Sequence, residues 1–151
     1  MLRAKLNDAL KDAMRAKDQR RIGTLRLVLA AIKDRDIAAR QPDSRDGIAD
    51  ADILSLLQAM VRQRRESIVQ YEKGGRADLV AQEQEEIAII ESFLPQQMDR
   101  AGIEAVAKEA VAELGATGIR DMGRVMAHLK SKYAGQMDFG KASGVVKGLL
   151  S

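Results

Sequence analysis

The sequence predicts an all-α protein. Of its 151 residues only two are proline, and 46% are hydrophobic although only 3% are aromatic, so the core is expected to be aliphatic. The strong helix formers Ala, Leu, Glu, Lys and Arg are abundant, and β-branched residues seldom occur in runs. Apolar residues recur at the three- and four-residue spacing of amphipathic helices. We expect an amino-terminal bundle of about four helices followed by a small three-helix domain.

Local signals define seven expected helices. They cover residues 2–16, 18–40, 50–73, 77–93, 99–115, 120–132 and 139–150. Asp18 and Asp50 stand where a side-chain oxygen can cap the second and third helices, and Asp99 begins the fifth.

Proline and glycine mark the ends of these helices. Gln41-Pro42 ends the second helix, because proline disfavours the α conformation in the residue before it, and residues 42–50 read as a polar loop. Gly74-Gly75 makes the turn between the third and fourth helices. Leu94-Pro95 ends the fourth helix, and we place the domain boundary there.

This boundary gives two expected domains, residues 1–95 and residues 96–151. The net charge also changes along the chain: it is +6 over residues 1–41, −5 over residues 42–97 and +2 over residues 98–151. A basic end of this size can attract phosphate groups.

The composition excludes several kinds of chemistry. The absence of cysteine removes disulfides, thiolate nucleophiles and most zinc sites. The single histidine, His128, has no carboxylate or hydroxyl neighbour recognisable by spacing, as a general base requires, so it is interpreted as a surface residue. No glycine-rich phosphate loop is present. We therefore expect no catalytic residues, no metal site and no cofactor.

The first residues do not resemble a secretory signal. Arg3 and Lys5 lead into an amphipathic segment, and no apolar run approaches the length that crosses a membrane. These features predict a cytoplasmic protein without a membrane partner.

Two charged residues fall in the middle of apolar helix faces. Arg64 lies on the apolar face of the third helix and Glu83 on that of the fourth, at the same level if Gly74-Gly75 folds the two into a hairpin. Because a lone buried charge is costly, we predict a structural ion pair between Arg64 and Glu83. An anion or substrate site in the bundle is the alternative interpretation.

The sixth helix combines an apolar and a basic face. Its apolar side is expected to bury Met122, Val125, Met126, Leu129 and Tyr133. The candidate nucleic-acid-binding residues lie opposite or at the edges: Arg120, Arg124, His128, Lys130 and Lys132. Such a basic row can contact phosphates without reading bases, although an ordinary solvated face is the alternative. Asp121 is interpreted as a charge at the helix start and Gly123 as a site of tight packing.

The seventh helix carries three glycines at four-residue intervals, Gly140, Gly144 and Gly148, with Lys141 and Lys147 beside them. Each glycine costs a helix about 1 kcal/mol relative to alanine, so the stripe suggests a partner that approaches the backbone closely. The partner is either a neighbouring helix or a sugar-phosphate strand. Because the apolar residues of this helix lie on its other side, including Leu149, we expect the stripe to face outward and bind nucleic acid.

Several motifs resemble the YqeY family. They are Thr24-Leu25-Arg26, Gln63-Arg64-Arg65-Glu66-Ser67, Tyr71-Glu72-Lys73-Gly74-Gly75-Arg76, Phe93-Leu94-Pro95, Asp121-Met122-Gly123-Arg124-Val125-Met126 and Gly140-Lys141-Ala142. The resemblance covers essentially the whole chain. The carboxy-terminal motifs also resemble the tail of GatB, a subunit of the glutamine-dependent aminoacyl-tRNA amidotransferase, although Ser143 stands where that tail commonly has Asn.

The resemblance implies an all-helical protein with the tRNA-holding tail of such an enzyme and without its catalytic domain. We therefore expect a tRNA-associated binding or adaptor protein, whose partners are tRNA and an aminoacyl-tRNA synthetase or amidotransferase component. A protein–protein interaction module is the first alternative. A carbon–nitrogen ligase that takes its amide nitrogen from glutamine, as the family label suggests, is the second.

Overall fold

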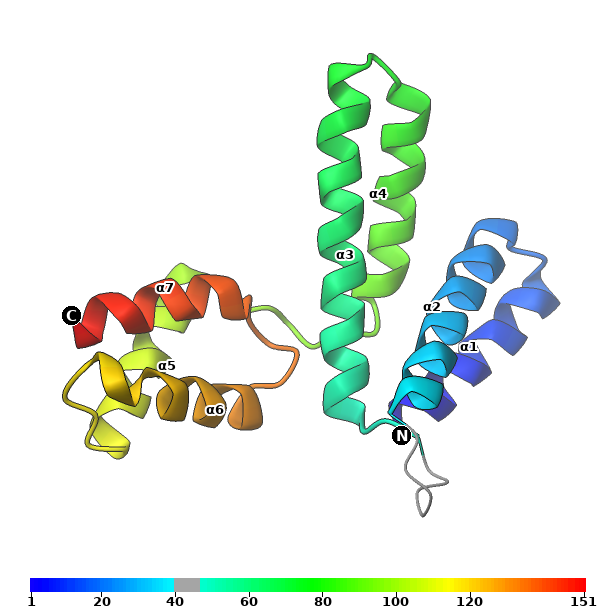
Figure 1. Ribbon diagram of the computed structural model, residues 1–151. Coiled ribbons are helices and arrows are strands. Elements are labelled where there is room, and N and C mark those ends of the chain that lie inside the picture. The colour runs from blue at the N-terminus through cyan, green and yellow to red at the C-terminus, as the bar shows by residue number, and fades with distance from the viewer. Residues whose placement is uncertain (40–46) are drawn as a thin grey trace. The chain divides into compact units, whose positions relative to one another are not determined.

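A computed structural model describes residues 1–39 and 47–151, and over these residues the protein is helical without any strand. The all-α prediction is confirmed. The elements are α1 (Leu2–Ala16), α2 (Gln19–Ala38), α3 (Asp50–Lys73), α4 (Ala77–Glu91), α5 (Arg100–Glu113), the 3-10 turn η1 (Ile119–Asp121), α6 (Met122–Lys132) and α7 (Phe139–Leu150), shown in Figure 1. Most of the polar loop expected over residues 42–50 lies outside the described residues, as does the expected helix end at Arg40.

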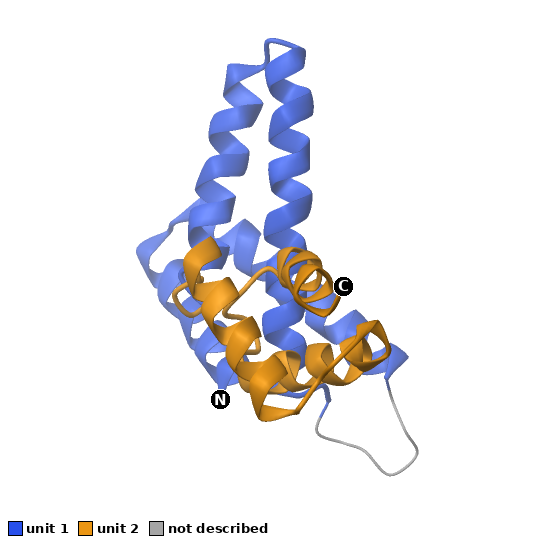
Figure 2. Ribbon diagram, turned by 90° about the vertical axis from the view of Figure 1, so that its left-hand side faces the viewer, with its two compact units in different colours: residues 1–94 blue, residues 95–151 orange. Residues whose placement is uncertain are grey.

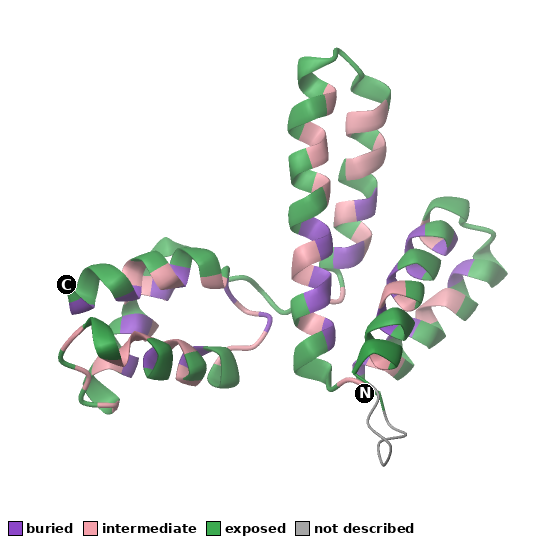
Figure 3. Ribbon diagram, viewed as in Figure 1, coloured by how far each residue is buried: buried purple, intermediate pink, exposed green. Residues whose placement is uncertain are grey.

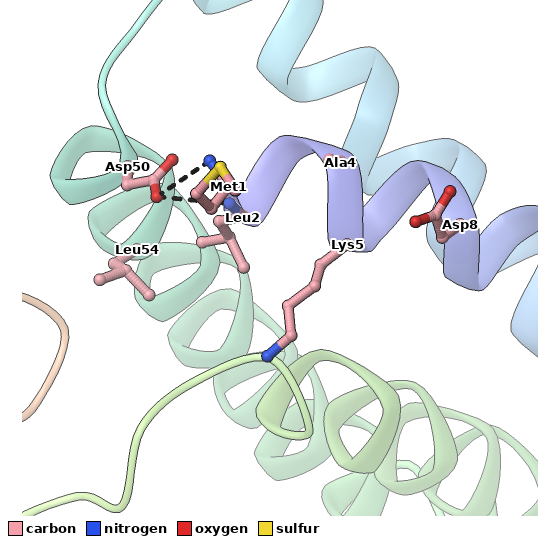
Figure 4. Close-up of a pocket in the computed structure, with 7 residues that line it drawn as sticks. All are labelled: Met1, Leu2, Ala4, Lys5, Asp8, Asp50 and Leu54. Carbon is pink, nitrogen blue, oxygen red and sulfur yellow. Dashed lines mark hydrogen bonds and ion pairs between the residues drawn. The ribbon is translucent and has the colours of Figure 1, made fainter.

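Two of the three aspartates expected at helix starts act as caps. Asp18 accepts a hydrogen bond from the backbone N–H of Arg21, and Asp99 accepts one from Gly102. The cap expected from Asp50 is wrong. Ala49 occupies the N-cap position of α3, and Asp50 Oδ2 instead accepts from the backbone nitrogen of Leu2 at 3.3 Å (Figure 4). Tertiary packing thus places this carboxylate at the positive start of α1.

The chain forms two compact units, Met1–Leu94 and Pro95–Ser151 (Figure 2). Unit 1 contains α1 to α4, in which α1 packs against α2, α3 packs against α4, and α2 also contacts both members of the second pair. Its largest fully buried side chains are Leu6, Leu25, Ile32, Ile53, Leu57 and Ile90. As the composition predicts, this core is aliphatic.

The core of unit 1 occupies one end of the α3–α4 hairpin. The buried residues of α3 end at Val61, and those of α4 begin at Glu86 (Figure 3). Beyond these positions the two helices lie against each other with half-buried apolar residues such as Ile68 and Leu79. The Arg64 region therefore lies where the multi-helix core ends.

Unit 2 contains α5, η1, α6 and α7. Its buried apolar residues are Ile103, Ala107, Ala110, Val125, Leu129, Met137, Ala142, Val146 and Leu150. Leu149, expected in this core, is 38% exposed because it lies at the border of the buried face of α7. The helix expected from Arg120 begins instead as η1, and α6 follows from Met122. A short connection then turns the chain so that α6 and α7 run antiparallel (Figure 1).

Candidate nucleic-acid interface

The outward face of α6 carries small residues between basic ones. Gly123, Ala127 and Ser131 recur every four residues and are all exposed. Arg124 and Lys130, also exposed, border this row on opposite sides. The tight packing expected at Gly123 is wrong, since a Cβ atom there would meet nothing within 4 Å. The sequence reasoning missed this second row, although its four-residue spacing is visible in the sequence.

The glycines of α7 divide into two kinds. A Cβ atom at Gly144 or Gly148 would meet nothing within 4 Å, so this part of the stripe is open to solvent. A Cβ atom at Gly140 would lie 3.1 Å from Asp138 Oδ1. That carboxylate caps α7 by accepting from the backbone nitrogens of Gly140 at 2.8 Å and Lys141 at 3.2 Å. Gly140 therefore serves the cap, and the open surface begins at Gly144.

Asp121 organises the turn that precedes α6. Its Oδ2 accepts from the backbone nitrogens of Thr117 at 3.0 Å and Gly118 at 3.3 Å, and its Oδ1 lies 3.2 Å from Arg124 Nη2. The hydrogen bond from Thr117 is the largest cause that holds the pKa of Asp121 below its usual range, with Gly118 and Arg124 adding to it. The expectation of a carboxylate at the helix start agrees with this position. Arg124 is thereby partly committed to an internal partner.

His128 also has an internal partner. Its Nε2 lies 3.4 Å from Oε2 of Glu113, which belongs to α5, and its side chain is 27% exposed. Spacing in the sequence indicates no carboxylate neighbour for His128, and packing supplies one from a residue 15 positions away, so this histidine is half-buried instead of fully exposed. His128 and Arg124 are therefore the least available of the predicted basic residues.

Of the seven basic residues predicted to bind nucleic acid, five make no ion pair with the residues that the structure describes. They are Arg120, Lys130, Lys132, Lys141 and Lys147, all exposed. Lys132 has its Nζ 5.6 Å from the ring centroid of Tyr133. Because α6 and α7 are antiparallel, Lys141 lies toward the α6 end that holds Lys130, and Lys147 lies toward the end that holds Arg120. The available cations thus lie in the last turn of α6, in η1 just before that helix, and near both ends of α7.

The predicted ion pair in unit 1 is part of a larger cluster. Arg64 Nε lies 3.8 Å from Glu83 Oε2 but 3.2 Å from Glu86 Oε2, which accepts its hydrogen bond. Arg20 of α2 lies 3.1 Å from Glu85 and 3.8 Å from Glu86. The sequence reasoning identified Glu83 and missed both Glu86, one turn further along the same face, and Arg20, which only packing reveals.

Glu83 is the poorly satisfied member of this cluster. Its Oε2 is buried and has no hydrogen-bond partner among the described residues. Burial raises the pKa of Glu83, and the nearby charge of Glu86 raises it further, while Arg64 opposes both. The three carboxylates Glu83, Glu85 and Glu86 outnumber the guanidiniums of Arg20 and Arg64, so negative charge is in excess. This arrangement suits a link between helices better than the alternative of an anion site.

An open pocket of about 560 Å³ lies between α1 and α3. Figure 4 shows its charged residues Lys5, Asp8 and Asp50, of which Asp50 is bound to the amino end of α1. Within residues 1–39 and 47–151, no group of three or more His, Cys, Asp or Glu side chains is arranged to hold a metal ion. Over the same residues, no helix combines the length and the apolar character needed to cross a membrane.

Comparison with known proteins gives the family. The model of the YqeY family, described as Yqey-like protein, matches residues 3–150. The chain belongs to the YqeY family. Membership rests on nearly the whole sequence and therefore includes both units.

Curated relatives carry the name altered inheritance of mitochondria protein 41, mitochondrial. The protein of Lachancea thermotolerans is 42% identical over 93 residues, which cover 62% of this chain and 48% of that protein. The protein of Eremothecium gossypii is 44% identical over 91 residues, or 60% of this chain and 48% of the relative. This YqeY-family chain spans about half the length of both. Because these relatives are named as mitochondrial proteins, the cytoplasmic location expected from the sequence is corrected.

Proposed function

We propose that this YqeY-family protein binds tRNA through the outward faces of α6 and α7, as a binding or adaptor protein without chemistry of its own. One observation carries the proposal. Two neighbouring antiparallel helices each expose a row of small residues, and the cations beside these rows include several without ion pairs.

The physical argument concerns how closely a phosphate backbone can approach. At Gly123, Gly144 and Gly148 no side chain separates the helix from solvent, so a sugar-phosphate strand can lie against the helix surface. Lysines at the edges of such rows can then neutralise phosphates and release counterions. Contacts of this kind position a nucleic acid without reading its bases. The resemblance of residues 97–151 to the GatB tail supports tRNA as the nucleic acid, and an amidotransferase or aminoacyl-tRNA synthetase component as a further partner.

The test compares two triple charge reversals with the same net charge. Lys130, Lys141 and Lys147 are replaced by Glu in one variant, and the exposed residues Arg62, Lys73 and Lys108, which have no ion pair in the described chain, are replaced by Glu in the other. Lys130 is preferred to Arg124 because changing Arg124 would also disturb Asp121.

Filter binding with total tRNA at several salt concentrations measures the outcome. The first variant is expected to bind at least about tenfold more weakly, and the slope of log affinity against log salt should fall by about three, one for each lost phosphate contact. The control variant should keep the wild-type slope. Equal slopes in all three proteins, or equal losses in both variants, would reject the assignment to α6 and α7.

A further inference from the structure

The helix α2 exposes an apolar row on the side that unit 1 does not use. Its buried side contains Ile22, Leu25, Val28 and Ile32. Its exposed side carries a second row, which we call the outer face of α2: Gly23, Leu27, Ala30, Asp34 and Ile37. Leu27 is 54% exposed and Ile37 is 61% exposed. Figure 3 shows exposed positions recurring along this helix.

The spacing of the outer face is that of a helix–helix seam. Its members are separated alternately by four and three residues, which keeps them in line along one side of a helix. The row contains two large apolar side chains, Leu27 and Ile37, and two small residues, Gly23 and Ala30, and a Cβ atom at Gly23 would meet nothing within 4 Å. The surface therefore offers both knobs and holes to a second helix. A helix that is apolar on two sides is normally covered on both.

The charges beside the outer face indicate the chemistry of the partner. Arg26 and Lys33 border the row on one side, are exposed, and make no ion pair with the residues that the structure describes. Asp34 interrupts the row as its only charged member. A matching helix would place acidic residues opposite Arg26 and Lys33, and a basic residue opposite Asp34.

We propose that the outer face of α2 binds an amphipathic helix of another protein whose polar border is acidic. A second copy of α2 fits poorly, because an antiparallel pairing would bring the basic borders together and a parallel pairing would bring Asp34 against its own equivalent. A nucleic acid fits poorly because the apolar side chains of Leu27 and Ile37 can neither donate a hydrogen bond to a phosphate nor neutralise its charge. The proposal concerns unit 1 and does not depend on tRNA binding by unit 2.

The test uses three synthetic helical peptides that share one Leu and Ile seam, with a single Lys opposite Asp34, and differ only in their border residues, which are Glu, Lys or Gln. Fluorescence anisotropy with the full chain at low salt should show the Glu peptide binding at least about fivefold more tightly than the Lys peptide. In the double variant Arg26→Glu and Lys33→Glu this preference should reverse. The matched variant Arg62→Glu and Lys73→Glu should leave it unchanged.

A third variant tests the seam itself. Leu27→Asp replaces an exposed side chain, so circular dichroism should show an unchanged helix content, while affinity for the Glu peptide should fall at least about tenfold. Equal binding of the Glu and Lys peptides, or no binding of the Glu peptide at about 1 mM, would overturn the proposal.

Other occupants have their own signatures, and each of them would also overturn it. A dimer seen by sedimentation and lost in Leu27→Asp would identify a second copy. Loss of tRNA affinity in the same variant would identify a nucleic acid. In NMR spectra of Leu27→Asp, altered amide signals from residues 95–151 would show that another part of this chain covers the outer face of α2.

Discussion

Two groups of basic residues, one in each unit, differ in whether they have an internal partner. In unit 1, Arg64 is 14% exposed and lies between Glu83 and Glu86, and Arg20 links α2 to α4. In unit 2, Lys130, Lys141 and Lys147 are exposed and make no ion pair within the described chain. A cation that already has a carboxylate partner must break that ion pair to bind a phosphate. An unpaired cation can bind a phosphate without breaking any internal contact. The comparison teaches that net charge is a poor guide to binding until the internal pairs are known.

The largest expected effect is the loss of the internal cation in unit 1. Arg64→Met leaves Glu83 and Glu86 close together without their shared partner, so the free energy of unfolding should fall by about 3 kcal/mol. Urea unfolding followed by Tyr71 fluorescence measures it, in a Tyr133→Phe background that removes the only other tyrosine. Arg65→Met, which removes an exposed pair with Glu91, should cost less than about 1 kcal/mol. Equal losses would contradict the expected difference between a mostly buried ion pair and an exposed one.

A smaller effect is expected at the start of α7, where unit 2 uses a carboxylate for structure. Asp138→Ala removes the acceptor of two backbone hydrogen bonds and should lower the free energy of unfolding by about 1 kcal/mol. Asp138→Asn keeps a side-chain oxygen at this position and serves as the control. Tyr133 fluorescence in a Tyr71→Phe background reports the change. An unchanged Asp138→Ala variant would show that the cap does not contribute to stability.

Glu83 gives unit 1 a stability that depends on pH. Because burial raises the pKa of Glu83, its contribution is fully present below the ordinary value of 4.5 and is lost as the pH rises through the folded-state pKa. Glu83→Gln, which cannot ionise, should therefore be more stable than the wild type by roughly 1 kcal/mol at pH 7 and gain nothing near pH 4.

Asp36 provides the opposite case in the same unit. Its hydrogen bond with Arg3 lowers its pKa, so its contribution is present above the ordinary value of 3.8 and is lost as the pH falls through the folded-state pKa. Urea titrations of the wild type and of Glu83→Gln, made between about pH 3 and pH 7, separate the two groups. The change due to Asp36 should occur in both proteins, whereas the change due to Glu83 should occur only in the wild type. A pH-independent difference between the two proteins would rule out the ionisation of Glu83 as the cause.

The smallest effect tests the open surface of α7. Gly144→Ala should raise the free energy of unfolding by up to about 1 kcal/mol, because alanine is the better helix former and its Cβ atom meets open space. Gly140→Ala should give no such gain, since its Cβ atom would approach Asp138 Oδ1 to 3.1 Å. Thermal unfolding compares the two variants. A destabilised Gly144→Ala protein would show that this part of the stripe is packed.

Local chemistry made much of the fold predictable. The expected bounds of α1, α3 and α7 agree with the observed Leu2–Ala16, Asp50–Lys73 and Phe139–Leu150. Glycine turns and apolar spacing act over a few residues, so they can be read without knowing how helices pack. The same reasoning placed Asp18 and Asp99 at helix starts, where each accepts a hydrogen bond from the third residue that follows.

The candidate site was less predictable because its properties depend on contacts between helices. Spacing showed no carboxylate neighbour for His128, which packing brings against Glu113, and Gly123 was expected to pack tightly and faces open space. A helical wheel places a residue on a face but does not say whether another helix covers that face. It also cannot tell Glu83 from Glu86 as the closer partner of Arg64, since both lie on one side of α4.

The sequence by itself determined that this chain is helical, where most of its helices begin and end, and that it belongs with YqeY proteins. The helices and their bounds follow from backbone preferences and hydrogen bonds between residues a few positions apart, and the family follows from its sequence motifs. Only the tertiary structure decided which carboxylates neutralise which cations, that Asp50 serves α1 instead of its own helix, and which glycines stay open to solvent. These outcomes depend on the distance and register between helices, where an ångström separates a hydrogen bond from a weak contact and a local pattern carries no such information.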